Sequence, residues 1–259
     1  MTIDVIILTD SSDVALTQRT IDTLHDSEID FRFRVQLVDS GTQDPNRYVR
    51  IHNYIHPESS FNYNKFLNIA FTYCLTEWVV ISNDDVAYER WWFSEMMKVH
   101  HYREDIEAFS PKDPLLYARW FPNHFVGTDS KYHESYAVTE ALQGWCTVIK
   151  RTALDKILPF DELFDMYYQD NDYAERLKQV GVKHALVRHS IVCHMETLNV
   201  GQISEAKSRK LRIDEIKFRN KSWLNPWEAT SPDGVPVNPD FKDIYRLSKR
   251  AAKSRNTFM

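Results

Sequence analysis

The stretch TEWVVISNDDVAY, residues 76–88, changes abruptly from apolar to acidic side chains. Trp78 to Ile81 are apolar, and Ser82-Asn83-Asp84-Asp85 follow directly. A short apolar run of this kind is typical of a buried strand. Two adjacent carboxylates at the end of a buried strand need a cation or hydrogen-bond donors to offset the cost of their burial. The stretch therefore predicts a strand that leads into a charged turn.

Alternating helix and strand patterns surround this stretch. We expect strands over residues 4–10, 31–41 and 78–85, and helices over residues 11–28 and 62–77. A β-α-β-α-β order predicts an open α/β fold with a mostly parallel sheet and right-handed crossovers. Ligands of such sheets bind beyond the carboxyl ends of the strands. We expect three polar strand ends to meet there, namely Thr9-Asp10, Asp39-Ser40 and Asn83-Asp84-Asp85.

The second half of the chain has a less regular pattern. Helices are expected over residues 90–105 and 170–181, the latter ended by Gly181, and Asp172 is expected to cap it. Residues 144–158 predict a strand that enters a helix, and residues 183–197 predict a further strand. Residues 110–140 show weak periodicity and are expected to form a long surface excursion. A basic helical stretch follows residue 200.

Charge and cysteine content exclude several classes of protein. The net charge is −5, yet residues 203–222 carry four excess positive charges and residues 242–255 carry five. Three well-separated cysteines indicate neither a disulfide framework nor a zinc site. There is no basic leader and no apolar run long enough for a membrane span. We expect a soluble cytoplasmic protein, in the host cytoplasm if a phage encodes it.

Two ordered sets of residues resemble the GT-A glycosyltransferases, especially the large inverting family 2. The first set has the family's spacing and consists of Asn68, Ala70, Cys74, Thr76-Glu77, Asn83 and Asp85. The second set consists of Gly144, Lys150-Arg151, Phe160-Asp161-Glu162, Gln169-Asp170-Asn171-Asp172, Arg176 and Gly181, with His194 beyond it. Several positions depart from the family pattern, notably Asn83 in place of the first Asp of Asp-x-Asp and Gln169 in place of Glu.

The resemblance implies a three-layer GT-A sandwich with a basic C-terminal helical extension. Residues 1–202 would form the catalytic domain, with a nucleotide-sugar half (1–90) and an acceptor half (91–202). Residues 203–259 would form an extension packed on that domain. Oligomeric state stays open.

The resemblance also implies a metal-dependent reaction. A hard divalent cation, Mn²⁺ or Mg²⁺, would bind the diphosphate of a nucleotide-sugar donor, UDP-linked in the expected case. Asp85 and His194 would be its protein ligands. Asp170 would be the general base that deprotonates the acceptor hydroxyl.

The donor site implied by the resemblance is built from residues of all three strand ends. Asp84 would meet the ribose or the water ligands of the metal, and Asp39 would hold the base or ribose. The remaining candidates are Thr9, Asp10, Asn68, Asn83 and Trp145. Two of these have an alternative structural role: Asp10 could cap the first helix, and Trp145 could belong to the core.

The acceptor and two competing functions remain open. The acceptor would be a glycan or lipid-linked glycan, or a hydroxymethylated base in DNA, as in phage enzymes of this type. The basic stretches 207–221 and 245–255 could follow a phosphate backbone, lie on anionic lipid, or be solvated helix faces. A nucleotidyltransferase of related fold is the alternative enzyme, although residues 8–19 lack the glycine-rich phosphate loop it would use. A non-catalytic sugar- or nucleic-acid-binding protein is the third possibility.

Overall fold

The computed structural model describes residues 1–41, 44–121, 125, 129–164, 166–195 and 205–221. The strands are β1 (Thr2–Thr9), β2 (Arg32–Asp39), β3 (Asn53–Ile55), β4 (Trp78–Asn83), β5 (Val86–Tyr88), β6 (Ile106–Lys112), β7 (Tyr132–Glu134), β8 (Cys146–Lys150) and β9 (Lys183–His194). The helices are α1 (Val14–Asp26), α2 (Tyr63–Phe71), α3 (Trp92–Tyr102), α4 (Pro114–Trp120), α5 (Arg151–Leu154), α6 (Gln169–Gln179) and α7 (Glu205–Arg219), with a 3₁₀ turn at Pro45–Arg47.

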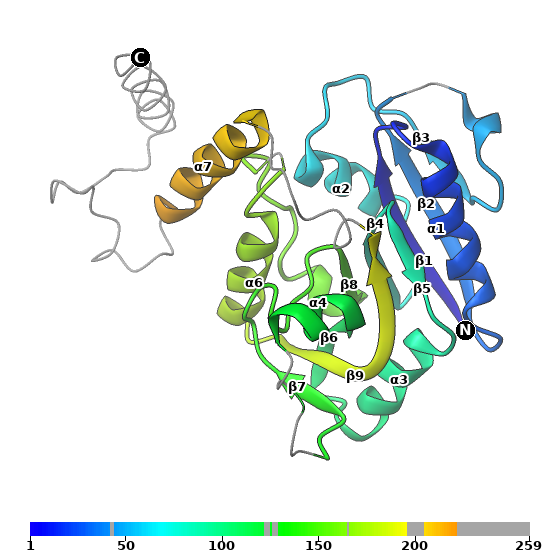
Figure 1. Ribbon diagram of the computed structural model, residues 1–259, viewed down its shortest axis with the longest axis vertical. Coiled ribbons are helices and arrows are strands. Elements are labelled where there is room, and N and C mark those ends of the chain that lie inside the picture. Colours follow the sequence, from blue (N-terminus) through cyan, green and yellow to red (C-terminus); the bar gives the residue numbers. More distant parts are fainter. Residues whose placement is uncertain (42–43, 122–124, 126–128, 165, 196–204, 222–259) are drawn as a thin grey trace, which may run out of the picture.

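One mixed sheet contains all the strands of the described residues, in the order β3-β2-β1-β4-β8-β6-β9-β5, with β7 beside β9 (Figure 1). The first four strands are parallel to one another, as the sequence predicted. β8 is antiparallel to β4 and β6, and β9 is antiparallel to β5 and β7 but parallel to β6. One half of the sheet is therefore parallel, and the other half is mixed.

The register of the parallel strands aligns their polar ends. Thr9 pairs with Asp39 across β1 and β2, and Leu8 pairs with Asn83 across β1 and β4. The three polar strand ends therefore meet at one edge of the sheet, and this sequence prediction is confirmed. Ligand sites of open α/β sheets lie at this edge.

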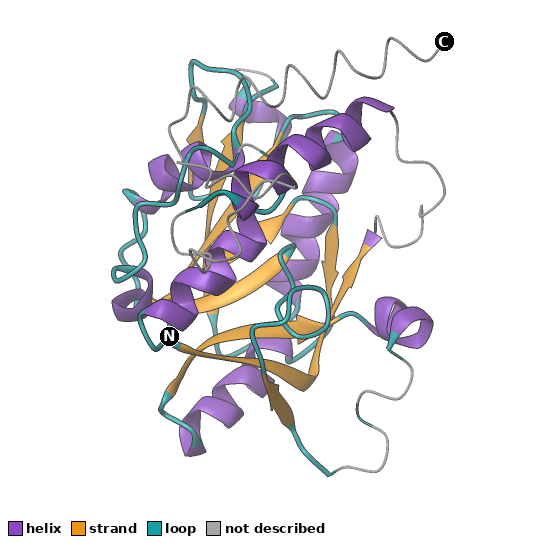
Figure 2. Cartoon of the chain, turned by 90° about the vertical axis from the view of Figure 1, so that its left-hand side faces the viewer, coloured by secondary structure: helices purple, strands orange, loops and turns teal. Residues whose placement is uncertain are grey.

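Helices cover both faces of the sheet (Figure 2). Alternate residues of β1 enter two separate cores: Val5 and Ile7 pack with residues of α1 and α3, whereas Ile6 and Leu8 pack with residues of α2, α5 and α6. Burial on both faces explains the continuous apolar run of β1, because neither side of this strand meets water. The predicted three-layer α/β class is confirmed.

Residues 110–140 contain more regular structure than the sequence predicted. β6 extends to Lys112, α4 occupies Pro114–Trp120, and β7 pairs with β9. Asp113 caps α4, because its carboxylate accepts hydrogen bonds from the backbone N–H groups of Leu115 and Leu116. A helix of seven residues is too short to show a clear apolar period, which explains why the prediction of a surface excursion was only partly right.

Two capping roles considered for aspartates were wrong. The N-cap of α6 is Tyr168, which has a positive φ of 61° and makes no side-chain cap, whereas Asp172 lies inside the first turn. The N-cap of α1 is Asp13, whose carboxylate accepts the N–H of Leu16. Asp10 instead accepts the N–H of Ser12. Gly181 follows α6 with φ of 71°, the left-handed conformation expected at a helix end.

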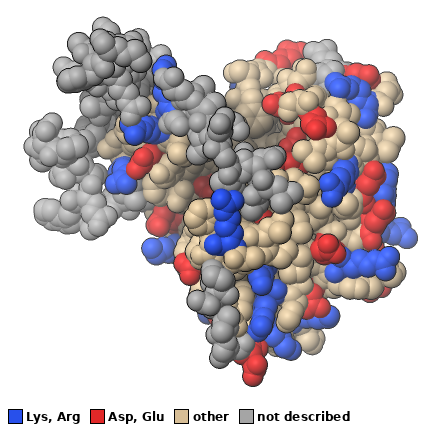
Figure 3. All heavy atoms as spheres, viewed as in Figure 1, with Lys and Arg blue, Asp and Glu red and all other residues tan. Residues whose placement is uncertain are grey.

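The basic stretch after residue 200 is helical over Glu205–Arg219, and α7 lies above α6 in the view of Figure 1. Residues 222–259, which include the second basic stretch, lie outside the described residues. Lys and Arg alternate with Asp and Glu over the face drawn in Figure 3. None of the described helices combines the length and apolar character that a membrane crossing requires.

Candidate active site

Backbone pairing brings the predicted metal ligands together at the carboxyl edge of the sheet. Val86 pairs with His194 across β5 and β9, and the N–H of Met195 donates to the carbonyl of Asp85. The N–H of Asn83 donates to the carbonyl of Trp145 just before β8. Residues that are far apart in the chain therefore share one small region.

Asp85 and His194 offer two adjacent donor atoms. Asp85 Oδ1 lies 3.2 Å from His194 Nε2. This oxygen is buried and receives no well-formed hydrogen bond from any described residue. Burial would raise the pKa of Asp85, but His194, the backbone N–H of Asp85 and the Asn83 side chain together lower it.

The spacing of these two atoms fits a shared cation. Two ligands at right angles, each about 2.1 Å from an octahedral ion, lie about 3 Å apart. Asn83 Nδ2 lies 3.4 Å from the same imidazole nitrogen, so the Asn83 side chain reaches this position too. A carboxylate oxygen, an imidazole nitrogen and an amide suit Mn²⁺. Within the described residues, no group of three or more His, Cys, Asp or Glu forms a closed metal cage.

Trp145 supports the imidazole of His194. The two rings are stacked, with centroids 5.4 Å apart and planes 8° from parallel. The indole N–H donates to Gln143 Oε1 at 3.1 Å, which fixes the ring. Trp145 is largely buried and belongs to the core, whereas its predicted contact with a sugar stays a prediction.

Threonines of α1 hold the Asp84–Val86 turn. Thr20 Oγ1 lies 2.7 Å from the carbonyl of Asp84 and 3.1 Å from the N–H of Val86. Thr17 Oγ1 donates to Asp84 Oδ2 at 3.2 Å. Burial raises the pKa of Asp84, and the neighbouring Asp85 adds to this rise. The threonines recur every three residues on the buried side of α1, a signal that sequence analysis missed.

Asp170 is set against Gly144 on the other side of the edge. A Cβ atom at Gly144 would lie 2.7 Å from both Cβ and Oδ2 of Asp170, so only glycine permits this approach. Asp170 Oδ1 accepts the N–H of Asn171 at 2.9 Å. Burial raises the pKa of Asp170. A carboxylate with a raised pKa is suited to accept a proton near neutral pH.

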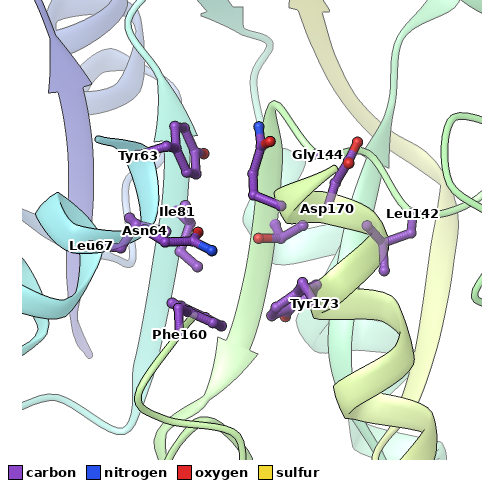
Figure 4. A pocket seen from close by; sticks show the side chains of 11 residues that line it. Tyr63, Asn64, Leu67, Ile81, Leu142, Gly144, Phe160, Asp170 and Tyr173 are labelled. Atoms are coloured by element: carbon purple, nitrogen blue, oxygen red, sulfur yellow. The ribbon is translucent and has the colours of Figure 1, made fainter. Parts of the chain in front are cut away.

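A narrow pocket lies between α2 and Asp170 (Figure 4). Its polar lining includes Tyr63, Asn64 and Gln169. The Tyr63 hydroxyl and Gln169 Oε1 are buried and have no hydrogen-bond partner among the described residues. Burial raises the pKa of Tyr63, and the charges of Asp170 and Asp84 add to this rise. Tyr63, which sequence analysis missed, therefore lies within electrostatic reach of both carboxylates.

Asp39 is the centre of a hydrogen-bond cluster behind the strand ends. Its Oδ2 accepts from Ser11 Oγ at 2.5 Å and from Tyr54 OH at 2.9 Å, and its Oδ1 accepts from the N–H of Gly41 at 2.8 Å. Tyr48 OH lies 2.9 Å from Ser11 Oγ. Asp39 is fully buried, so it fixes the position of these side chains and does not itself face solvent.

The remaining candidates differ in their surroundings. Thr9 is buried, with its hydroxyl 3.2 Å from that of Thr17, and Asp10 is exposed. Asn68 is used within the protein: its amide Nδ2 donates to the carbonyl of Phe160 at 2.9 Å, and its Oδ1 accepts the N–H of the same residue at 2.8 Å. Asn68 therefore connects α2 to the loop before α6, and its predicted contact with the donor is not supported by this geometry.

No family model matches the sequence, and no characterised protein matches it significantly. The structure resembles solved glycosyltransferases. A mannosyltransferase from Pyrobaculum calidifontis, in complex with GDP-Man and Mn²⁺, superposes with a TM-score of 0.57 at 14% identity over 83% of this chain. GalNAc-T7, with UDP, GalNAc and Mn²⁺, gives a TM-score of 0.63 at 11% identity over 96% of this chain. TarS of S. aureus gives 0.57 at 14% identity over 88%.

These similarities concern the fold. This chain spans 61% of the mannosyltransferase, 55% of GalNAc-T7 and 45% of TarS. The expectation from the sequence is confirmed at this level, and the chain has the GT-A fold of nucleotide-sugar glycosyltransferases.

Proposed function

We propose that this chain is an inverting, metal-dependent glycosyltransferase that uses a nucleotide-sugar donor. The observation that carries the proposal is the Asp85–His194 pair at the carboxyl edge of a GT-A sheet, because its two donor atoms are spaced for one cation. Structural neighbours in complex with GDP-Man or UDP and with Mn²⁺ support it. When bound, the cation would offset the charge of the departing diphosphate.

The side chains divide into two roles in the proposed reaction. Asp85, His194 and Asn83 would hold the metal, and Asp84 would face the ribose. Asp170 would accept the proton of the acceptor hydroxyl while the hydroxyl oxygen bonds to the anomeric carbon and the bond from that carbon to the diphosphate breaks. Attack from the side opposite the diphosphate inverts the anomeric centre. The raised pKa of Asp170 supports its role as the base.

We further propose a glycan or lipid-linked glycan as the acceptor. The basic stretch 207–221 turns Lys217 and Lys221 inward, where both bind protein oxygens. These two charges are therefore not offered to a polyanion. Lys and Arg alternate with Asp and Glu over the face in Figure 3, which does not favour a long phosphate backbone there.

The test is nucleotide release by the purified full-length chain from UDP-glucose, UDP-GlcNAc, UDP-galactose and GDP-mannose. Each donor is assayed with Mn²⁺, with Mg²⁺ and with EDTA. Metal-dependent release of the nucleoside diphosphate from one of these donors is the expected result. Release of pyrophosphate from a nucleoside triphosphate and a sugar phosphate would instead identify a nucleotidyltransferase. Donor binding without any turnover would identify a binding protein.

A further inference from the structure

Helix α7 contacts the segment that leads into Asp170. Lys217 Nζ donates to the carbonyl of Leu163 at 2.8 Å. Asp214 Oδ2 accepts the backbone N–H of Tyr167 at 3.1 Å, and Asp214 Oδ1 pairs with Lys217 Nζ at 2.7 Å. Asp214 is fully buried, so this helix uses a desolvated carboxylate to hold a backbone amide three residues before Asp170.

The end of α7 adds a second attachment. Lys221 Nζ lies 2.6 Å from Asp161 Oδ2 and 2.5 Å from Asp172 Oδ1. Asp172 is fully buried, and its other oxygen binds Arg176 Nε at 2.8 Å. Lys221 therefore bridges the start of the segment and the first turn of α6, on both sides of Asp170 in the sequence. The ring of Phe164 lies under the ammonium group, 4.6 Å away.

Asp170 tolerates little displacement. Its side chain is in contact distance of Gly144, and it lies two residues after Tyr168, which has a positive φ. A left-handed tyrosine persists only where its surroundings hold it. The rings of Tyr168 and Phe218 on α7 lie 5.5 Å apart, so the same helix covers this residue as well.

We propose that Asp214 of α7 and Lys221, two residues beyond its end, are positioning residues, which hold Asp170 against Gly144 in the orientation for proton transfer. This inference rests on the proposed role of Asp170 as the base. It makes α7 part of the catalytic unit, although the sequence pattern had placed it in a separate extension. A misplacement of a reacting group by about 1 Å can lower a rate on the order of 10²-fold.

Lys221 is also a cationic partner of Asp172, which lies two residues after Asp170. Burial raises the pKa of Asp172, while Lys221 and Arg176 oppose this rise. Without Lys221, the Asp172 carboxylate keeps Arg176 alone as its cation, and more negative potential reaches Asp170. A nearby negative charge raises the pKa of a carboxyl group. Tyr63, Tyr168 and Tyr173 also lie near Asp170, and burial raises the pKa of each of these tyrosines.

The experiment compares Lys221→Met, Lys221→Arg and Arg219→Met in the full chain. Arg219 is the matched control, because this last residue of α7 lies two positions before Lys221 but is exposed and pairs with Glu215. For Lys221→Met we expect kcat for nucleotide release to fall on the order of 10²-fold with little change in donor KM, and the acidic limb of the pH–kcat profile to move to higher pH. Lys221→Arg should restore most of kcat, and Arg219→Met should match wild type. Equal loss in the two methionine variants would overturn the inference.

Hydrogen exchange provides a readout that does not depend on activity. The Tyr167 amide should exchange faster in Asp214→Asn and Lys221→Met than in wild type or Arg219→Met. Unchanged exchange with unchanged kcat would show that α7 does not position this segment. If wild type releases nucleotide from none of the donors, the proposed function fails, and the exchange rates still decide whether α7 holds the segment. If Lys221→Met does not fold, Lys221→Met with Asp161→Asn, which keeps the charge balance, takes its place.

Discussion

At the scale of single residues, the Asp85 carboxylate is notable because one of its buried oxygens lacks a hydrogen-bond donor among the described residues. Its Oδ1 is buried beside an imidazole nitrogen and lacks a well-formed hydrogen bond from the described residues. Leaving a buried carboxylate oxygen in this state is costly unless a ligand completes it. The arrangement is therefore more readily explained by ligand binding than by stability.

We expect Asp85→Ala to abolish metal-dependent binding of UDP or GDP and to leave the fold intact. The substitution removes one of the three proposed protein ligands and also removes a buried charge. Calorimetry with nucleotide and Mn²⁺ measures the binding, and circular dichroism checks the fold. Wild-type turnover at saturating Mn²⁺ would contradict the assignment of Asp85 as a ligand.

Asp170→Asn should separate chemistry from binding. Asparagine keeps the volume of the side chain beside Gly144 but cannot accept the acceptor's proton. We expect transfer to fall by about 10² to 10⁴-fold, the usual contribution of a positioned general base, with donor affinity retained. Single-turnover kinetics measure the rate of transfer, and a nucleotide-binding titration measures the donor affinity. An equal loss of donor affinity would show that Asp170 binds the donor and is not the general base.

The same substitution should stabilise the protein near neutral pH. Because burial raises the pKa of Asp170 above 3.8, the folded state holds this proton more tightly than the unfolded chain does. The stability from this group is fully present below pH 3.8 and is lost as pH rises through the raised pKa. An asparagine side chain does not ionise, so Tm of Asp170→Asn should exceed that of wild type near neutral pH, and the difference should shrink as the pH falls towards the unfolded value. If the difference in Tm between Asp170→Asn and wild type were the same at every pH, ionisation of Asp170 would not be its cause.

The sequence predicted the polar residues at the strand ends better than the side chains of other elements that lie next to them. Asp84 and Asp85 could be named as candidates because they end an apolar run, and Asp170 and His194 because they match positions of the GT-A pattern. Tyr63 and Gln169 could not, because their role depends on how α2 faces α6 across the sheet. Asp172 was assigned to a cap because capping is a local interaction, whereas one of its two partners, Lys221, is 49 positions away.

At the scale of elements, α1 acts as a support for the turn after β4. Thr20 binds both the carbonyl of Asp84 and the N–H of Val86, and both bonds are buried or partly buried. The strands and the longer helices followed from apolar periodicity. α4 and β7 did not, because a short element depends on its neighbours more than on its own pattern.

We expect Thr20→Val to destabilise the protein by about 1–3 kcal/mol, the cost of leaving a buried backbone group without its partner. The two side chains have nearly the same shape, so packing changes little. Mn²⁺-dependent nucleotide affinity should fall as well, because the Asp84–Val86 turn loses its support. Urea unfolding measures the first effect and titration the second. Thr72→Val, at an exposed helix end, is the control and should change neither.

At the scale of the whole molecule, the positive charge of the C-terminal residues bears on whether the acceptor is a glycan or DNA. Residues 242–255 carry five excess positive charges and lie outside the described residues. Five contacts between these side chains and the phosphates of duplex DNA would lower log affinity by about 4.5 units for each tenfold rise in salt. For a chain that acts on glycans, no such salt dependence of DNA binding is expected.

We expect the full chain and a form ending near Pro239 to bind duplex DNA equally weakly, with flat salt dependence. The reason is that the proposed acceptor is a glycan and that isolated surface charges contribute little. Fluorescence anisotropy across a salt series measures both forms. A steep slope that disappears on truncation would contradict this expectation, and transfer to a hydroxymethylated duplex would then be the decisive assay.

The stacking of Trp145 on His194 has an optical consequence. An indole in contact with an imidazole transfers excited-state electrons to it when the imidazole is protonated, and paramagnetic Mn²⁺ at the same ring would also quench its emission. Trp145 is one of seven tryptophans, so only part of the emission should respond. If Mn²⁺ binds at the proposed site, part of the tryptophan emission of the unlabelled chain should fall when the metal is added, without donor or acceptor.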